Sequence, residues 1–282
     1  MPDFKHFWDA ASLGRTEELQ PLLARGANIE ERGGMTQSSP LHAAARMGCS
    51  EAVKLLLDHG ADVSSCDLTG RTPLQETAAS GHVKVALLLL QNGAAVSAQS
   101  LHEGATAMHF AARYGDWSAN LSVLRLLISK GADTSAKDND GGTALFWAAR
   151  DGKRAVVPFL LFHDKGADLQ SMSNGRTPED VAFSRSHLEV AAMLKAEALR
   201  RATCEAFAMG QHERLGEGSR VRGLEPEVVR MLLQAGGLLP QRNVRGWEAG
   251  DEEEEVEEEE EGEDFISSDP DSYSNSDEDE QW

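Results

Sequence analysis

Apolar residues recur along the first 200 residues in units that hold two different helical patterns. In the clearest unit, a capping serine and a proline open an alanine-rich stretch that ends at Gly48. Val53, Leu56 and Leu57 follow at positions i, i+3 and i+4, which form one face of a helix. Each unit is therefore predicted to contain a small-residue inner helix and a leucine-rich outer helix, closed by a turn such as Gly60-Ala61-Asp62.

The unit repeats with a nearly fixed period. Ser39 is followed by Thr72, Thr106, Thr143 and Thr177 at steps of 33, 34, 37 and 34 residues. Residues 1–28 keep the glycine and leucine positions but lack Thr-Pro, as expected for a terminal repeat with no preceding neighbour. This period and these repeated sequence motifs resemble the ankyrin-repeat family from about Lys5 to Leu199. The resemblance implies an all-α solenoid of about six helix-turn-helix repeats joined by β-hairpin-like loops, over residues 1–202.

The repeated residue types have mechanical explanations. Thr72 is expected to cap an inner helix, with Pro73 at the first helical position. Gly48 is expected to end its helix with a positive φ. His42 and His109 stand where an imidazole bridges neighbouring turns by hydrogen bonds.

Three repeats depart from the pattern. In the fourth, Gly115 to Gly131 spans 16 residues where Gly48 to Gly60 spans 12, so the extra residues are expected to bulge around 116–120. The fifth has Phe146 in the histidine position and Pro158 in its outer helix. The sixth has Lys195 in an apolar position, as a closing cap requires, and its helix is expected to continue through residues 196–202.

Residues 203–245 are predicted to form a helical extension or C-terminal cap. Residues 224–233 have the pattern of an amphipathic helix with Pro226 in its first turn. This helix is expected to dock on the last repeat. The sequence of this helix also resembles the opening helix of F-box modules. That resemblance leaves open an alternative function as a substrate-recruiting adaptor of a ubiquitin ligase.

Charge separates the end of the chain from the rest. Residues 248–282 hold 19 of the 47 Asp and Glu and none of the 27 Lys and Arg, so the net charge of -20 belongs almost entirely to this end. Residues 246–282 are therefore predicted to be a disordered acidic tail. Three roles stay open: solubilisation, attraction of a basic partner, or competition with the ligand for the repeats. The tail serines, such as Ser276, lie in the acidic context of phosphorylation sites.

No pattern predicts catalysis, a cofactor or a metal site. A GxxxxGK loop, an HExxH helix and a nucleophile elbow are all missing from the sequence, and its nine histidines are scattered. The three cysteines form no CxxC pair, and the start of the chain lacks the pattern of a signal peptide. We therefore expect a soluble, monomeric, cytoplasmic or nuclear protein that is no enzyme. Its acidity argues against direct nucleic-acid or membrane binding.

The ankyrin resemblance implies a protein-binding scaffold. Partners are expected on the hairpin tips and on the two variable positions before each inner-helix glycine. On the helices these positions give Arg46, Met47, Ala79, Ser80, Arg113, Tyr114, Arg150 and Asp151, and on the tips Leu68, Thr69, Arg71, His102, Glu103, Asn139, Asp140 and Gly142. Arg46, Arg113 and Arg150 are expected to form a broken ladder on the concave face. Trp117 and Trp147 either join this surface or belong to the core.

Overall fold

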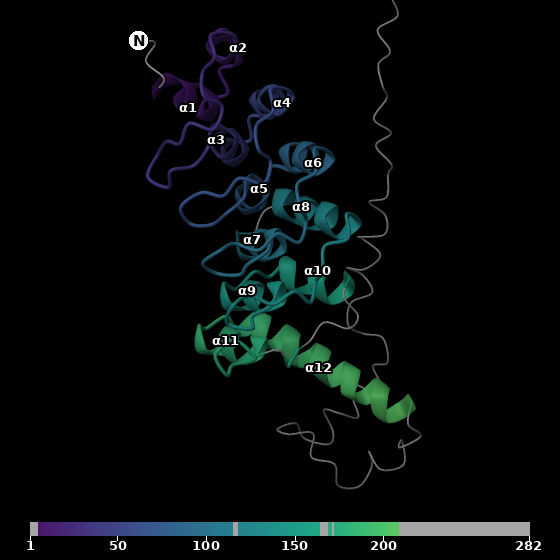
Figure 1. Cartoon of the computed structure of the whole chain (residues 1–282). Coiled ribbons are helices and arrows are strands. Elements are labelled where there is room, and N and C mark those ends of the chain that lie inside the picture. The colour runs from purple at the N-terminus through teal and green to yellow at the C-terminus, as the bar shows by residue number, and fades with distance from the viewer. Residues whose placement is uncertain (1–4, 115–117, 164–168, 171, 209–282) are drawn as a thin grey trace, which may run out of the picture. The chain divides into compact units, whose positions relative to one another are not determined.

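The computed structural model describes residues 5–114, 118–163, 169–170 and 172–208 (Figure 1). Trp117, the predicted extension at 203–245 beyond Ala208, and the predicted tail at 246–282 lie outside the described residues. Within the described ranges the chain forms twelve helices. They are α1 (Lys5–Ser12), α2 (Thr16–Ala24), α3 (Pro40–Met47), α4 (Ser50–Asp58), α5 (Pro73–Ser80), α6 (Val83–Gln91), α7 (Ala107–Tyr114), α8 (Ser118–Ser129), α9 (Ala144–Arg150), α10 (Val156–His163), α11 (Pro178–Ser184) and α12 (Leu188–Ala208).

The helices form six antiparallel pairs that stack in chain order (Figure 1). The inner helices α1, α3, α5, α7, α9 and α11 pack consecutively against one another. Behind them the outer helices α2, α4, α6 and α8 pack in the same order, and α10 contacts α12. The predicted all-α solenoid of about six repeats is confirmed. The helix α12 is continuous to Ala208, so residue 202 lies within it.

The core is continuous through the stack because each repeat leaves its small residues and its leucines facing a neighbour. Ala44, Ala78 and Ala111 are fully buried on the inner helices, and Leu56 and Leu89 are fully buried on the outer ones. The small side chains let adjacent inner helices approach closely. No single pair of helices covers both of its faces, so stability comes from stacking.

Local sequence sets the ends of the inner helices as predicted. The side chain of Thr72 accepts a hydrogen bond from the Gln75 backbone N–H, and the Gln75 side chain accepts one from the Thr72 N–H, which completes a capping box. Pro73 occupies the first helical position. Gly48 and Gly81 end α3 and α5 with φ of 76° and 81°, in the left-handed region that favours glycine.

The loops between repeats form a row that we call fingers 1 to 5 (residues 32–38, 66–71, 99–105, 137–142 and 172–176). Fingers 1 and 5 each contain an isolated antiparallel bridge, Gly33–Ser38 and Ser173–Arg176. Successive fingers are joined by backbone hydrogen bonds. Leu68 N–H donates to Thr36 O at 2.9 Å, Leu101 N–H to Gly70 O at 3.2 Å, and Asn139 N–H to Glu103 O at 3.0 Å.

A side chain from each of the first four inner helices also holds a finger. His42 Nε2 donates to Arg71 O at 2.9 Å, and His109 Nε2 donates to Gly142 O at 3.1 Å, since a carbonyl oxygen only accepts. The expectation that these two histidines bridge neighbouring turns is thus confirmed. Trp8 and Gln75 occupy the same position in their repeats and donate to Ser38 O and to Ala98 O and Ala105 O.

The expectation of a bulge at residues 116–120 is wrong for its second half. Residues 118–120 belong to α8, which is 12 residues long, whereas α4 and α6 have nine. Three of the four extra residues therefore lengthen the outer helix. Asn120 is 3% exposed, and its Nδ2 donates to Ala78 O in α5 at 3.1 Å, so this extension is tied to the preceding repeat.

Candidate protein-binding surface

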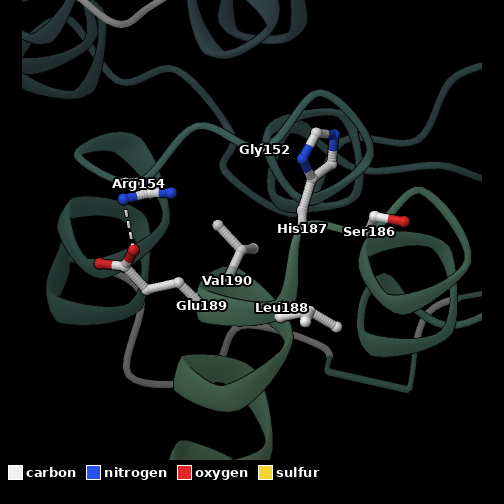
Figure 2. Close-up of a pocket in the computed structure, with 7 residues that line it drawn as sticks. All are labelled: Gly152, Arg154, Ser186, His187, Leu188, Glu189 and Val190. Carbon is white, nitrogen blue, oxygen red and sulfur yellow. Dashed lines mark ion pairs between the residues drawn. The ribbon is translucent and has the colours of Figure 1, made fainter.

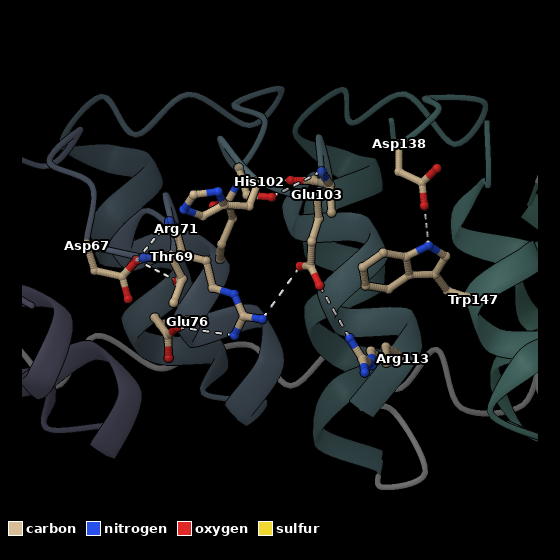
Figure 3. Close-up of polar contacts among 12 residues, drawn as sticks. Asp67, Thr69, Arg71, Glu76, His102, Glu103, Arg113, Asp138 and Trp147 are labelled. Atoms are coloured by element: carbon tan, nitrogen blue, oxygen red, sulfur yellow. Dashed lines mark hydrogen bonds and ion pairs between the residues drawn. The ribbon is translucent and has the colours of Figure 1, made fainter. Parts of the chain in front are cut away.

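Three arginines and three carboxylates form one network across the inner helices and fingers of repeats three to five. Figure 3 shows its part from Arg71 and Glu76 through Glu103 to Arg113. Arg71, from finger 2, lies 3.5 Å from the carboxylate of Glu76 on α5 and 3.6 Å from that of Glu103 in finger 3. Glu103 also contacts Arg113 on α7 at 3.7 Å. Fingers 2 and 3 are thus connected to each other, finger 2 also to α5 and finger 3 also to α7.

The network continues into the fifth repeat. Arg113 Nε lies 3.4 Å from Asp151 Oδ2, and Arg150 Nε lies 3.3 Å from Asp151 Oδ1. The predicted arginine ladder is therefore present in part, but Arg113 and Arg150 are paired with carboxylates of the same chain. Arg46 forms no ion pair with any residue that the structure describes. A ligand at this surface meets a preorganised and largely neutral network rather than a row of free cations.

Aromatic rings lie beneath the guanidinium groups of this network. Arg71 is 4.4 Å from the ring centroid of Phe110, and Arg150 is 4.9 Å from that of Trp147. Arg113 lies between two rings, at 5.3 Å from Trp147 and 5.4 Å from Tyr114. Such contacts restrict the arginine side chains, so less conformational entropy is lost when a partner binds.

Trp147 belongs to the core, which decides between the two alternatives that the sequence left open. The side chain is 3% exposed, and its Nε1 donates to Asp138 Oδ2 in finger 4 at 2.6 Å. Its ring also meets His109 edge to face, with centroids 5.4 Å apart. Burial lowers the pKa of His109, so the imidazole is neutral where it donates to finger 4.

The finger tips are held by side-chain hydrogen bonds. His102 Nε2 donates to Leu68 O at 2.9 Å, and Asn139 Nδ2 donates to His102 O at 3.0 Å. Within finger 2, Asp67 accepts from both the N–H and the hydroxyl of Thr69. The tip residues therefore keep fixed positions relative to one another from finger 2 to finger 4.

The remaining predicted residues lie beside the network. Met47 and Tyr114 are exposed, at 55% and 42%, and Ser80 is exposed between them in the stack. Asp140 is exposed at the tip of finger 4. The sequence analysis did not single out Glu76, Phe110 or Asp138. Only Glu76 had a local signal, because it follows Arg71 by five residues.

A pocket lies at the junction of repeats five and six, where its lining begins at the residue after Asp151 (Figure 2). The lining residues are Gly152, Arg154, Ser186, His187, Leu188, Glu189 and Val190. Arg154 forms an ion pair with Glu189 at its edge, and His187 stacks on Gly152. The pocket is thus a gap between two repeats, and its one charged pair is exposed and self-neutralised.

Among the described residues, no three His, Cys, Asp or Glu side chains are grouped so that they could hold a metal ion. No described helix combines the length and the apolar character that a membrane span requires.

Comparison with known proteins identifies the family. The model for ankyrin repeats (3 copies) matches residues 7–100 and 109–202. The chain therefore belongs to the ankyrin-repeat family. Repeats of this family are protein–protein interaction modules, which supports a binding role rather than a catalytic one.

Several curated proteins are similar to part of the chain. Neurogenic locus notch homolog protein 1 of Homo sapiens is 28% identical over 153 residues, and the protein of the same name from Danio rerio has the same identity. Neurogenic locus notch homolog protein 2 of Homo sapiens is 29% identical over 152 residues. Each match covers 54% of this chain but only 6% of the relative. The chain thus spans only a small part of the length of these relatives.

Proposed function

We propose that this chain is a non-catalytic scaffold that binds a protein partner on its inner helices and finger tips, centred on Arg71, Arg113, Tyr114 and Arg150. The observation that carries the proposal is the network around Arg113, in which one guanidinium contacts two carboxylates and two aromatic rings. Arginine and aromatic residues that are held in place and half-exposed are typical of the residues that dominate binding energy at interfaces.

The acidic end of the chain belongs to the same proposal. Residues 248–282 carry 19 carboxylates and no basic residue. Such a charge raises the rate at which a basic partner encounters the repeats, and the effect weakens with salt. The pairing of Arg113 and Arg150 with Asp151 favours this role over competition of the tail for the arginines, because those arginines already have carboxylate partners.

Affinity capture from a cell extract with the full chain tests the proposal. Partners retained by the unchanged protein are expected to be lost, by about tenfold or more, with Arg113→Ala/Tyr114→Ala, since central interface residues of these types have effects of this size. Arg15→Ala is the matched control, because Arg15 is an exposed arginine that pairs with Glu18 in the first repeat, outside the network. A chain cut after Arg245 is expected to lose the salt dependence of binding.

The controls make the outcomes separable. Circular dichroism and urea unfolding must show that the double variant retains its fold. Equal capture by the unchanged protein, by Arg113→Ala/Tyr114→Ala and by Arg15→Ala would place the binding surface elsewhere. Affinity that is independent of salt and of residues 246–282 would remove the role of the tail alone.

A further inference from the structure

The last inner helix of the described stack exposes a large apolar side chain at a position that is buried in the repeats before it. Six residues after the serine or threonine that opens each unit, repeats two to five have an alanine that is 0% exposed. These alanines are Ala45, Ala78, Ala112 and Ala149. The sixth repeat has Phe183 there, on α11, and it is 68% exposed (Figure 1). The exposure therefore reflects the lack of a following repeat within the described residues.

Phe183 is not the kind of residue that a solvent-facing terminal repeat requires. Capping repeats are expected to have a polar outer face, and a phenylalanine left in water forgoes the free energy of burying its ring. The size of the ring also argues against a regular seventh repeat, because small side chains at this position let adjacent inner helices approach closely. The exposed side of α11 thus fits a covering segment that is apolar but is not another inner helix.

A segment of this kind is present later in the same chain. Residues 227–237 repeat the pattern of residues 51–61 position by position, with Glu, Val, Leu, Leu and Gly identical in both. The earlier segment is most of the outer helix α4 and the turn after it, in which Ala52, Val53 and Leu56 are 0% exposed. The corresponding residues, which lie outside the described ones, are Val228, Val229 and Leu232.

The intervening chain is long enough for this segment to reach α11. Residues 209–226 contain no Thr-Pro or Ser-Pro of an inner helix, so they do not complete a seventh repeat. The helix α12 has 21 residues and spans about 30 Å, whereas the residues from 209 to 226 extend to about 60 Å at most.

We propose that residues 227–237 form an amphipathic helix that packs Val228, Val229 and Leu232 over Phe183 and closes the stack. The pattern of an outer helix supports this packing, because α4 buries the equivalent face against the inner helix α3. A helix that is buried in this way is not free to recruit a ubiquitin ligase. The inference therefore also opposes the adaptor function that the sequence left open.

Hydrogen exchange of the full chain, followed by mass spectrometry at pH 7.5, tests the inference. Amides of residues 228–234 are expected to exchange at least about tenfold more slowly than those of residues 250–260, relative to their intrinsic rates, because a docked helix is hydrogen-bonded and a highly charged segment is not. Phe183→Ser is expected to speed exchange in residues 228–234 by about tenfold, as for the loss of a buried apolar contact. A purely local effect of this variant would not reach a segment so distant in the sequence.

A pair of variants within the segment locates its docking face. Leu232→Ser is expected to speed exchange by about tenfold both in residues 228–234 and in α11. Arg230→Ser is the matched control, since Arg230 corresponds to Lys54, which is exposed on α4. Exchange in this control is expected to stay within about twofold of the unchanged protein, as for a surface substitution.

Four outcomes would contradict the inference. Exchange in residues 228–234 as fast as in residues 250–260 would mean that no docked helix is present. Exchange that Phe183→Ser leaves unchanged, or equal effects of Leu232→Ser and Arg230→Ser, would mean that this face does not cover α11. A dimer in sedimentation velocity that dissociates with Phe183→Ser would indicate that a second copy covers the ring instead. None of these results bears on Arg113→Ala/Tyr114→Ala, so failure here is distinct from failure of the proposed function.

Discussion

At the scale of single residues, one position of the repeat determines how each inner helix is connected to a finger. Trp8, His42, Gln75 and His109 all occupy it, and each donates a hydrogen bond to a backbone carbonyl of a finger. The residue types differ, but each combines an N–H donor with a largely apolar body. Phe146 lacks the donor, and in its repeat Trp147 donates to Asp138 instead.

The two buried histidines predict how stability depends on pH. Burial lowers the pKa of His42 and of His109 below the usual value near 6.5. Protonation would also place a hydrogen on Nδ1, where His109 accepts from the Thr106 N–H at 3.1 Å. The unfolded chain thus binds more protons than the folded chain below that value. The free energy of unfolding is therefore expected to be constant above about pH 7 and to fall as the pH decreases through 6.5 towards the lowered pKa.

Urea unfolding at pH 7.5, 6.5 and 5.5 measures this dependence. The control is His42→Gln/His109→Gln, because Gln75 already makes the same kind of connection without a titrating group. Stability of this variant is expected to change less between pH 7.5 and 5.5, whatever its absolute value. If the slopes of the two proteins were the same, neutral buried histidines would not be the cause.

At the scale of elements, the turn between the two helices of a repeat depends on glycine for two separate reasons. Gly48 has a positive φ, and a Cβ built there would lie 2.5 Å from Nδ1 of His82. The other ring nitrogen of His82, Nε2, donates to Arg46 O. Gly60, at the end of the next outer helix, has a φ of 86° but open space around it. The two positions therefore separate backbone strain from steric contact.

Replacement of these glycines by alanine is expected to show that separation. Gly60→Ala should lower the free energy of unfolding by about 1–2 kcal/mol, the approximate cost of the left-handed conformation for an L-residue. Gly48→Ala should lower it further, because His82 must also move and lose its bond to Arg46 O. Urea unfolding at pH 7.5 compares the two. Equal losses would mean that the His82 contact relaxes without cost.

Comparison of the helices and turns with the sequence-based predictions shows which features the sequence could predict. The cap at Thr72 and the end of α3 at Gly48 depend on residues within one turn, so they were predicted correctly. The prediction of a bulge at residues 118–120 was wrong because glycine spacing counts residues and does not distinguish a loop from a longer helix such as α8. The pairing of Arg113 with Asp151 joins different repeats, and no local pattern contains that geometry. Whether Trp147 is buried depends likewise on Asp138 and the neighbouring helices.

At the scale of the whole stack, each repeat contacts mainly its neighbours, so stability is a sum of repeat and interface contributions. The network from Arg71 to Arg150 joins repeats three, four and five through side chains. Buried His109 and Trp147 also connect repeats four and five. The proposed binding surface thus lies on the most extensively connected part of the described stack.

Amide hydrogen exchange is expected to show that local stability differs between the central repeats and the last repeat. Amides of α5 and α7 should be the most protected, because these helices have neighbours on both sides and are linked to fingers by Gln75 and His109. The helix α11 should open more readily. It has seven residues, and the residue after its C-cap, Ser186, is held at a φ of 64° that does not favour a residue with a side chain.

The variant Leu74→Ala tests whether α11 opens independently of α5 and α7. Leu74 is 1% exposed in α5, so its truncation should lower the free energy of unfolding by about 2–5 kcal/mol. Protection in α5 and α7 is expected to fall, whereas exchange in α11 should change little, because α11 already opens without unfolding of the central repeats. Protection of α11 as high as that of α5 in the unchanged protein, or an equal loss in both helices with Leu74→Ala, would indicate a single cooperative unit instead.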